Sequence, residues 1–367
     1  PRVHKLILRA KEVEWKMPVL RIHGEGTPGV ARMVEGLLEE FRARGYTLEG
    51  EVPDLVFNLI RKEEPKPYRR RNQGTFVVSF LELEAFPENP IQALYPYLVR
   101  ALSNQLVAYV PGQGAKFLTL ELGHYDEPEG EGFLRRLADR IYPLACSRLV
   151  IKNRFEPDLE PELWKGDGLT RSLAEAGRKL KEWDLLPAPF PIEEILPPED
   201  LRHVKRLYGI GGLSYGNLSV RKDERRFWMS ASGVDKANLK EIGRDILMVK
   251  DYDPRENAIV LSVPPHVEPR RVSVDAIEHW MIYREHPQVG AILHVHAWME
   301  GVEATPFNYP CGTWELAQAV AEKVRQAKDP AQAVVGLKNH GLTITGRSME
   351  EILERIEGRL LRTVPMV

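Results

Sequence analysis

The sequence has little cysteine. Its 367 residues contain only Cys146 and Cys311, which lie far apart in the chain. Two such residues provide neither a disulfide framework nor a CxxC metal motif, and this usage fits a reducing cytosol. Long hydrophobic runs are also lacking, since no apolar stretch approaches the roughly 20 residues that cross a bilayer. The first residues lack the apolar core of a signal peptide. We therefore expect a cytoplasmic protein without a membrane partner.

A large excess of one charge is absent as well. The 51 basic and 53 acidic residues give a formal net charge of −2, which offers no field to attract nucleic acid. One basic run, Lys66-Pro67-Tyr68-Arg69-Arg70-Arg71, stands between two apolar runs. We interpret this run as a solvated loop, with an anion site as the alternative.

The length predicts two domains, and strand and helix signals alternate along the first part of the chain. We expect an N-terminal α/β domain of unknown role over residues 1–160 and a second domain over residues 167–367. Residues 153–166 are rich in proline and acidic side chains and lack periodicity, so the linker is expected there. The first domain is expected to contain helices over 29–44, 91–110 and 132–149 and strands over 18–22, 55–60, 75–83 and 116–122.

The second part becomes rich in strand signals after Gly209. Its predicted strands cover residues 216–221, 227–230, 245–249, 258–261, 291–296, 334–337 and 343–345. Its predicted helices cover residues 169–183, 198–207, 274–284, 313–325 and 349–361.

The most informative motif is His294-Val295-His296 within the predicted strand 291–296. Residues two apart on a strand point to the same face, so both imidazoles would leave the strand in one direction. His340, between Asn339 and Gly341 beside a later strand, offers a third ring. Three histidines with one position left open are typical of a catalytic zinc. The alternative is a set of buried histidines with structural hydrogen bonds.

Asp275 opens the predicted helix that precedes this strand. A carboxylate at a helix N-terminus is favoured by the helix dipole, and beside a metal it can move a proton. A plain helix cap is the alternative. His279 lies one turn later on the same helix face, where it either orients the carboxylate or fills a buried structural position.

Two turns rich in glycine and small polar residues expose backbone N–H groups of the kind that bind phosphate. They cover residues 211–219 and 230–233. Most such turns have only a structural role. A third small-residue segment, residues 23–29, joins a predicted strand to a predicted helix. It is either an anion site at a helix N-terminus or a simple connection.

In combination, these segments resemble the class II aldolase/adducin superfamily, which includes fuculose-phosphate aldolase and ribulose-5-phosphate 4-epimerase. The resemblance covers residues 169–361, and we recognise no family for residues 1–165. It implies a three-layer αβα domain with a mixed, largely antiparallel central sheet. It rests on the order and spacing of Glu175-Ala176-Gly177-Arg178, Gly216-Asn217-Leu218-Ser219-Val220-Arg221, Ser230-Ala231-Ser232-Gly233-Val234, Asp275 with His279, Tyr283-Arg284, His286-Pro287, His294-Val295-His296-Ala297, Gly312-Thr313, Glu315-Leu316 and Asn339-His340-Gly341.

The resemblance assigns roles to single residues. It implies that Zn2+ is held by His294, His296 and His340. It implies that Asp275 is the catalytic acid/base, and the choice of Asp there leans towards the epimerase. A small, probably phosphorylated substrate and a homotetramer are implied by resemblance only. The implied substrate- and phosphate-binding residues are Asn217, Ser232, Gly233 and Ser273.

The expected function is a zinc-dependent lyase of the aldolase type, or an epimerase, that acts on a small phosphorylated sugar or hydroxy-carbonyl compound through a metal-stabilised enediolate. The segment 297–311 is shorter than the pocket-closing segment of typical relatives. Glu300, Glu303 and Tyr309 are candidates to replace its groups, with surface or core roles as the alternative. Because of this shortening, the other reading of the domain is a catalytically degenerate, metal-binding scaffold of the adducin type.

Overall fold

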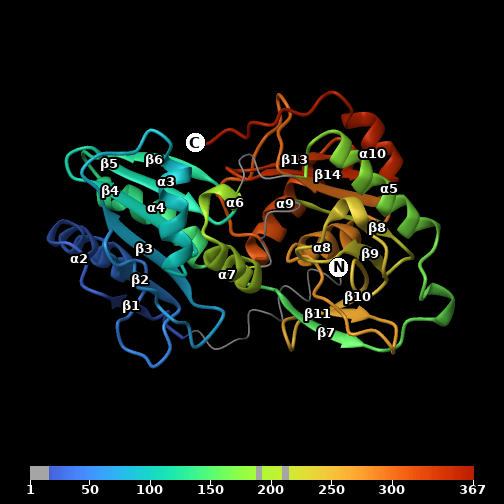
Figure 1. Cartoon of the computed structure of the whole chain (residues 1–367), viewed down its shortest axis with the longest axis horizontal. Helices are drawn as coiled ribbons and strands as arrows, with labels where there is room; N and C mark the ends of the chain where they lie inside the picture. Colours follow the sequence, from blue (N-terminus) through green and yellow to red (C-terminus); the bar gives the residue numbers. More distant parts are fainter. Residues whose placement is uncertain (1–15, 187–191, 209–214) are drawn as a thin grey trace. The chain divides into compact units, whose positions relative to one another are not determined.

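The computed structural model describes residues 16–186, 192–208 and 215–367. The chain divides between Ser147 and Arg148 into two compact units, and Glu193–His203 group with the first of them. Each unit has its own sheet (Figure 1). Within the described ranges, no helix is both long and apolar enough to cross a membrane.

The N-terminal unit is built on a six-stranded sheet in the order β1-β2-β3-β4-β5-β6. The first four strands are parallel neighbours, and β5 and β6 continue the sheet in antiparallel pairing. The strands are β1 (Leu20–His23), β2 (Leu55–Leu59), β3 (Phe76–Glu82), β4 (Gln105–Val110), β5 (Gly114–Thr119) and β6 (His124–Pro128).

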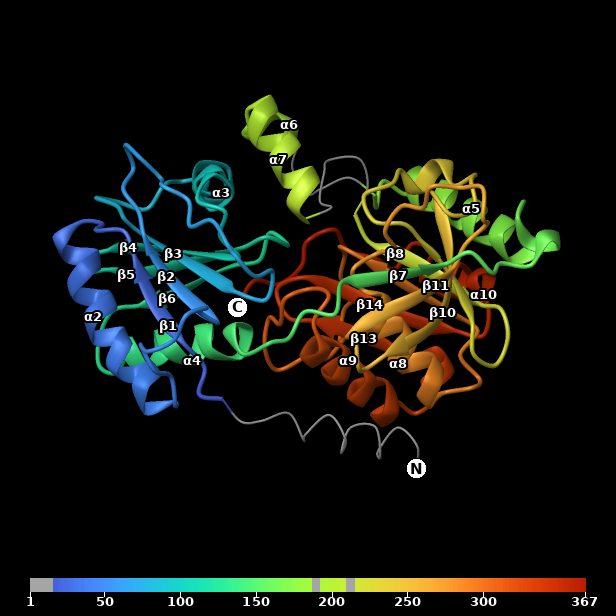
Figure 2. The same cartoon turned by 90° about the horizontal axis from the view of Figure 1, so that it is seen from below.

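Helices cover both faces of this sheet. The helices α2 (Pro28–Ala43) and α4 (Phe133–Ala145) contact each other and share one hydrophobic cluster with one sheet face. The helix α3 (Pro90–Arg100) contacts β4 and β5, and Figure 2 shows it on the opposite side of the sheet from α2 and α4. The N-terminal unit is therefore the α/β domain that the alternation of signals predicts.

The predicted helix over residues 91–110 is wrong in its second half. The helix α3 ends at Arg100, Leu102 adopts a positive φ of 55°, and β4 begins at Gln105. All residues of β4 are buried between β3 and β5. No glycine or proline marks the break between helix and strand, so the apolar run reads as one continuous helix.

The C-terminal unit is built on an eight-stranded sheet in the order β13-β14-β12-β8-β9-β10-β11-β7. Every neighbouring pair is antiparallel except β11 with β7. The prediction of a mixed, largely antiparallel sheet is confirmed. The strands are β7 (Lys152–Glu156), β8 (Asn217–Arg221), β9 (Phe227–Ser230), β10 (Ile246–Asp253), β11 (Ala258–Ser262), β12 (Ala291–Val295), β13 (Val334–Leu337) and β14 (Gly341–Gly346).

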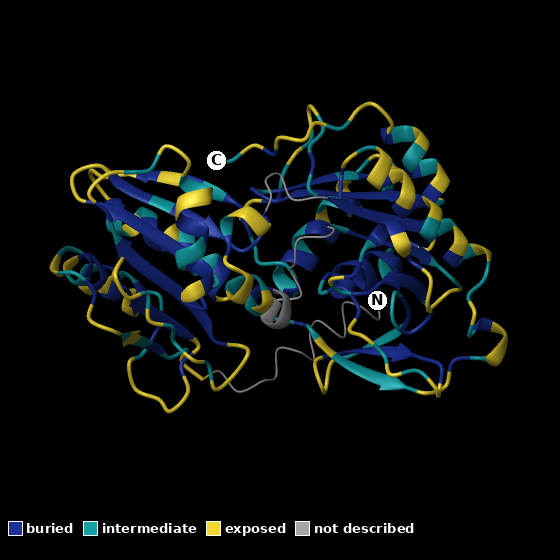
Figure 3. Ribbon diagram, in the orientation of Figure 1, coloured by how far each residue is buried: buried dark blue, intermediate teal, exposed yellow. Residues whose placement is uncertain are grey.

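Two helix pairs complete three layers. The helices α5 (Gly168–Glu182) and α10 (Met349–Ile356) contact each other and the strands β8, β12 and β14. The helices α8 (Ala276–Glu285) and α9 (Trp314–Gln326) contact each other and the strands β10 and β13. The central strands are buried (Figure 3) and belong to one hydrophobic cluster. The short 3-10 helices of this unit are η2 (Pro161–Leu163), η3 (Lys236–Asn238) and η4 (Pro330–Gln332), and the segment that groups largely with the first unit forms α6 (Ile192–Ile195) and α7 (Pro198–Tyr208).

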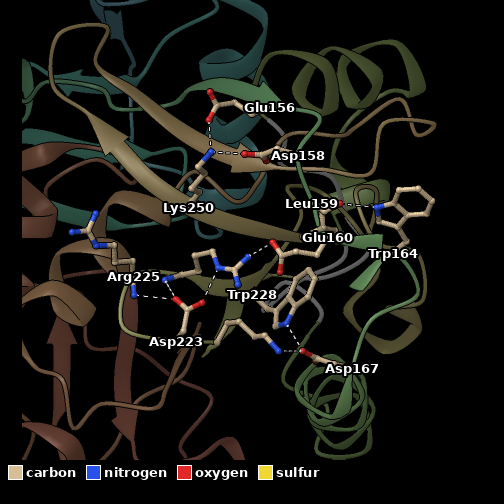
Figure 4. Close-up of polar contacts among 12 residues, drawn as sticks. Glu156, Asp158, Leu159, Glu160, Trp164, Asp167, Asp223, Arg225, Trp228 and Lys250 are labelled. Atoms are coloured by element: carbon tan, nitrogen blue, oxygen red, sulfur yellow. Dashed lines mark hydrogen bonds and ion pairs between the residues drawn. The ribbon is translucent and has the colours of Figure 1, made fainter. Parts of the chain in front are cut away.

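The linker predicted over residues 153–166 is instead part of the C-terminal unit. It contains most of β7, which pairs in parallel with β11. The segment is also tied to β10, because Lys250 donates to the carboxylates of Glu156 and Asp158 (Figure 4). The acidic side chains that suggested a solvated linker are partners of basic residues on the sheet. The division of the chain therefore falls before β7 and not near residue 160.

Candidate metal centre

The three predicted histidines come from neighbouring strands near the middle of the C-terminal sheet. The strand β12 is buried along its whole length between β14 and β8. It carries His294, which is 2% exposed, and His296 follows directly after it. His340 lies in the turn between β13 and β14 and is 4% exposed. Because β14 is the immediate neighbour of β12, this turn meets the end of β12.

The backbone of this turn explains the sequence around His340. Asn339 adopts the left-handed conformation with a φ of 59°, which asparagine tolerates better than most residues. A Cβ atom on Gly341 would lie 2.3 Å from the carbonyl oxygen of Val295, so only glycine fits. The turn can therefore pack directly on the end of β12, which brings His340 to the HxH motif.

The rings of the three histidines converge. Their centroids are separated by 5.1 Å between His294 and His296 and by 4.8 Å from each of these to His340. One ring nitrogen from each lies within 4.8 Å of the others. The Nε2 atoms of His296 and His340 are 3.2 Å apart. Two nitrogens bound tetrahedrally to one zinc at ordinary Zn–N lengths would be about 3.3 Å apart. The spacing therefore suits one shared cation.

The protonation of the rings also suits a metal. The Nδ1 atom of His294 lies 2.9 Å from the carbonyl oxygen of Leu342 and must donate to it, which leaves the Nε2 lone pair for a ligand. Burial, and then the charge of His294, lower the pKa of His340 to about 3. Burial and the charges of both other rings hold the pKa of His296 well below its usual value. His296 and His340 therefore offer neutral nitrogen donors beside Nε2 of His294.

Asp275 is placed beside this cluster by α8. It precedes the first residue of the helix and is 5% exposed. Its Oδ2 accepts a hydrogen bond of 2.7 Å from the side-chain amide of Asn217, and its Oδ1 accepts one of 3.3 Å from the backbone N–H of Gly312. Asn217 is also the strand partner of His294, so this hydrogen bond places the carboxylate beside the cluster. The carboxylate is thus fixed near the cluster by two donors.

Asn217 holds Asp275 through its amide nitrogen, and its binding of phosphate stays a prediction. Its own Oδ1 is buried and has no partner among the described residues. Gly216 precedes it with a φ of 82°, and a Cβ there would lie 2.3 Å from the carbonyl oxygen of His294. This close contact sets the start of β8 against β12 and so places Asn217 between the metal centre and α8.

The remaining predicted phosphate-binding residues lie at the ends of β9 and of the segment before α8. Ser273 is 8% exposed, and its Oγ accepts from the backbone N–H of Asp275. Ser232 is half-buried and donates its backbone N–H to Arg271, and Gly233 is exposed with a φ of 68°. Their binding of phosphate stays a prediction. Residues 211–214 of the first glycine-rich turn lie outside the described residues.

His279 does not orient Asp275. Its Nδ1 lies 2.6 Å from the hydroxyl of Ser219, which also contacts the hydroxyl of Tyr283 at 2.8 Å. The ring is fully buried, and burial lowers its pKa to about 3, with a smaller contribution from His294. Of the two interpretations of His279, the structure supports the buried structural position.

Two buried charged residues at this site were missed by sequence reasoning. Glu278 is 2% exposed, and its Oε1 accepts a hydrogen bond of 2.7 Å from the hydroxyl of Thr343, the strand partner of His294. Lys236 in η3 is 3% exposed, burial lowers its pKa to about 8, and its charge lowers the pKa of His296. Neither position carries a pattern that separates it from surface charge, because helix α8 is buried all round and η3 is a short turn.

The buried carboxyl of Glu278 predicts a pH dependence of stability. Burial, and then the charge of Asp275, raise the pKa of Glu278 well above 4.5 in the folded protein. The folded state then binds more protons than the unfolded state, so stability falls as pH rises above about 4.5 towards the folded-state pKa. Glu278→Gln keeps an acceptor for Thr343 and removes this loss. We therefore expect the Glu278→Gln variant, treated with chelator, to be more stable than the parent protein. The gain in the free energy of unfolding should be larger at pH 8 than at pH 4.5.

Urea unfolding at the two pH values measures this difference, at about 1.4 kcal/mol for each unit of pKa shift. Glu303→Gln is the matched control, because Glu303 is exposed and contacts only Lys323 at 3.2 Å. A stability difference for Glu278→Gln that does not change with pH would show that this carboxyl is ionised in both states.

The second half of the chain is similar to known proteins. Residues 202–300 match the family described as Class II Aldolase and Adducin N-terminal domain. A methylthioribulose-1-phosphate dehydratase of Citrobacter koseri is 30% identical over 173 residues, covering 39% of this chain and 78% of the relative. The enzyme of the same name from Klebsiella pneumoniae is 25% identical over 172 residues, covering 39% and 79%. The solved structure of an L-fuculose 1-phosphate aldolase aligns with a TM-score of 0.35 and 20% identity, over 53% of this chain and 84% of that chain.

Proposed function

Because this chain belongs to the class II aldolase and adducin family, we propose that it is a zinc-dependent lyase that acts on a small phosphorylated sugar or hydroxy-carbonyl compound. The proposal rests above all on the convergence of His294, His296 and His340. Three neutral imidazoles satisfy three positions of a zinc site and leave one for substrate oxygen. A divalent metal held there would supply a positive charge that stabilises negative charge on a substrate carbonyl.

Asp275 is the proposed proton carrier. Its two hydrogen bonds, from Asn217 and from the backbone of Gly312, fix the direction of the carboxylate. A fixed carboxylate near a polarised carbonyl can remove a proton from the substrate and return one later. Asn217 is in this scheme a positioning residue for Asp275.

The substrate phosphate is assigned to the turns beside β8 and β9. Ser232 and Gly233 follow the end of β9, and Ser273 donates its backbone N–H to Ser230 at that end. The bridge between Ala231 and Val272 holds the two segments together. Exposed backbone N–H groups and hydroxyls in such turns suit a phosphate. Lys236, which follows Ser232 and Gly233 closely in the chain, adds a buried basic group to this part of the unit.

The reaction is proposed as a proton transfer that leads to cleavage or elimination. The dehydratase name of the relatives from Citrobacter koseri and Klebsiella pneumoniae favours loss of water from a ketose phosphate. Aldol cleavage needs the same polarised carbonyl and the same carboxylate. Epimerisation, which Asp275 suggested from the sequence, would proceed by carbon–carbon cleavage and re-formation at the same groups.

The test is turnover by zinc-loaded protein. A panel of ketose 1-phosphates that includes methylthioribulose 1-phosphate is incubated with the protein and followed by phosphorus NMR. We expect one member to be consumed, with dehydration, cleavage or epimerisation told apart by the products, and with the activity lost after chelation and restored by zinc. Consumption that chelation does not reduce would contradict a metal-dependent reaction.

A metal-binding scaffold is the second candidate. Residues 296–313, all of them described, contain no helix between β12 and α9. Tyr309 is only half-buried there, and Glu303 pairs with Lys323 at the surface, so neither supplies an evident replacement for pocket-closing groups. Stoichiometric zinc without turnover of any panel member would favour the scaffold.

A further inference from the structure

The N-terminal unit contains an open pocket of about 660 Å³ that is strongly basic. Four of its lining residues carry a full positive charge, a fifth is a histidine, and none is acidic. All of them come from β1 and from the loop between β2 and β3. The lining residues are Arg21, His23, Lys66, Pro67, Tyr68, Arg69 and Arg71.

The strand β1 places two of these residues on one face. Arg21 and His23 are two apart, so they point to the same side of the sheet. Leu20, one position earlier, belongs to the hydrophobic cluster that β2, β3, α2 and α4 form. The pocket therefore lies on the face of β1 opposite to that cluster, where α2 and α4 do not cover the sheet.

The basic loop is held in place at both ends. The fully buried side chain of Asn58 donates its amide to the carbonyl oxygen of Lys66 at 3.0 Å. Arg70 donates to the backbone carbonyl of Thr75 at 3.0 Å and to the side chain of Asn104 at 2.6 Å. Arg70 is thus a structural residue, and its anchoring sets the positions of the two arginines that flank it in the pocket.

His23 is oriented by the same asparagine. The amide nitrogen of Asn58 also donates to the hydroxyl of Ser79 at 3.1 Å, so its Oδ1 is the acceptor that faces Nδ1 of His23 at 2.9 Å. The Nδ1 atom of His23 therefore carries a hydrogen, and Nε2 has no partner among the described residues. Apolar side chains would pack as well as Asn58 and Ser79 at these buried positions. We therefore interpret the hydrogen-bonded residues His23, Asn58 and Ser79 as a preorganised support for the pocket.

The positive charge of the pocket is not balanced within the unit. Arg69 and Arg71 are exposed and have no ion-pair or hydrogen-bond partner in the described part of the chain. Lys66 meets only Glu64, at 3.7 Å between two exposed side chains. Arg21 donates to the backbone carbonyls of Gly50 and Glu51. Like charges held close together by the fold repel each other, and an anion relieves that repulsion.

We propose that this pocket binds the phosphate group of a small phosphorylated molecule. The arginines and Lys66 would hold the phosphate oxygens, as guanidinium groups do in pairs. The volume is within the range of small-molecule sites. His23 and Tyr68, whose ring centroids are 5.2 Å apart, offer an aromatic wall for the organic part of the ligand. The net charge of −2 and the limited volume of the pocket favour a small anion over nucleic acid.

The helix α2, which follows β1, is not part of this site. A Cβ atom on Gly29 would lie 2.1 Å from the carboxylate oxygen of Glu82, so an acidic side chain already lies at that helix N-terminus. Of the two interpretations of residues 23–29, the simple connection holds for the glycine-rich part. His23 alone contributes to the anion pocket.

Calorimetric titration of the full chain with inorganic pyrophosphate tests the proposal. The protein is kept in EDTA at constant ionic strength, so that the histidine cluster of the other unit carries no metal. Arg69→Ala/Arg71→Ala should raise the dissociation constant by about 100-fold, since each charge-assisted contact contributes about tenfold. Arg61→Ala/Lys62→Ala is the matched control, because it removes two exposed charges from the same loop outside the pocket and should change the constant less than twofold.

Further titrations separate this site from the other unit and from other partners. His294→Ala and Ser232→Ala should leave the high-affinity pyrophosphate binding unchanged, whatever the fate of the proposed lyase activity. Equal weakening by both double variants would show unspecific attraction and overturn the proposal. Absence of binding to the parent chain would overturn it too, as would a single-stranded oligonucleotide that binds more tightly than pyrophosphate and displaces it.

Discussion

Replacing His294 with alanine is expected to lower the zinc affinity of the chain by more than about 100-fold and to leave its fold intact. Loss of an outer partner of a metal ligand already costs about 10- to 100-fold, and His294 is a proposed direct ligand with its Nε2 free for the metal. The fold should persist because the core of this unit comes from apolar residues on β12 and its neighbours, not from the cluster.

Equilibrium dialysis with metal analysis measures this affinity, and circular dichroism follows the fold. His266→Ala is the matched control, since His266 is an exposed histidine of the same unit whose ring contacts only Trp164 in the described structure. Unchanged zinc content in His294→Ala would remove the basis of the metal assignment. Loss of zinc from His266→Ala as well would point to unspecific binding by histidines.

Replacing Asp275 with asparagine is expected to lower turnover by about 10²- to 10⁴-fold, the usual contribution of a general acid/base, while zinc stays bound. Asparagine has the same shape and can still accept one of the two hydrogen bonds that Asn217 and Gly312 donate. It cannot take up a proton. The separation of lost turnover from retained metal distinguishes a proton carrier from a metal ligand.

The assay uses the panel member that the parent chain consumes, with exchange of substrate hydrogen for solvent deuterium as a second readout. Both should fall together in Asp275→Asn. Glu354→Gln is the control, because it neutralises an exposed carboxylate on α10 of the same unit and leaves Asp275 in place. Activity above about a tenth of the parent in Asp275→Asn would exclude this residue as a general acid/base that contributes 10²-fold or more.

The metal centre was predictable because its signal is local. His294 and His296 are two apart within an apolar strand, and this spacing alone places both rings on one face. The close approach of His340 depends on Asn339 and Gly341, which the sequence displays as a turn. These residues specify their own geometry and need no knowledge of distant parts of the chain.

The errors arose where distant contacts override local pattern. The helical periodicity of residues 91–110 continues into β4, and only pairing with β3 and β5 converts its second half to a strand. Residues 153–166 resemble a linker until β11 supplies a partner for β7. Glu278 and Lys236 gain their significance from burial, which depends on how the whole unit packs.

The basic run 66–71 predicts a solvated loop, with an anion site as the alternative. Its sequence carries no sign of the buried residues that support the proposed pocket. Asn58 lies in β2 as a single polar residue of an apolar strand, and its contacts with His23 and Ser79 cross two strand boundaries. A single polar residue in a buried strand indicates hydrogen-bond partners on the neighbouring strands.

X-ray absorption at the zinc edge of the loaded, full-length protein tests the central claim most directly. The account predicts three imidazole nitrogens at about 2.0–2.1 Å, from His294, His296 and His340, and one or two light atoms that exchange with added ligands. A shell of four protein ligands with no exchangeable position would contradict it. So would a sulfur scatterer, since neither Cys146 nor Cys311 belongs to the cluster.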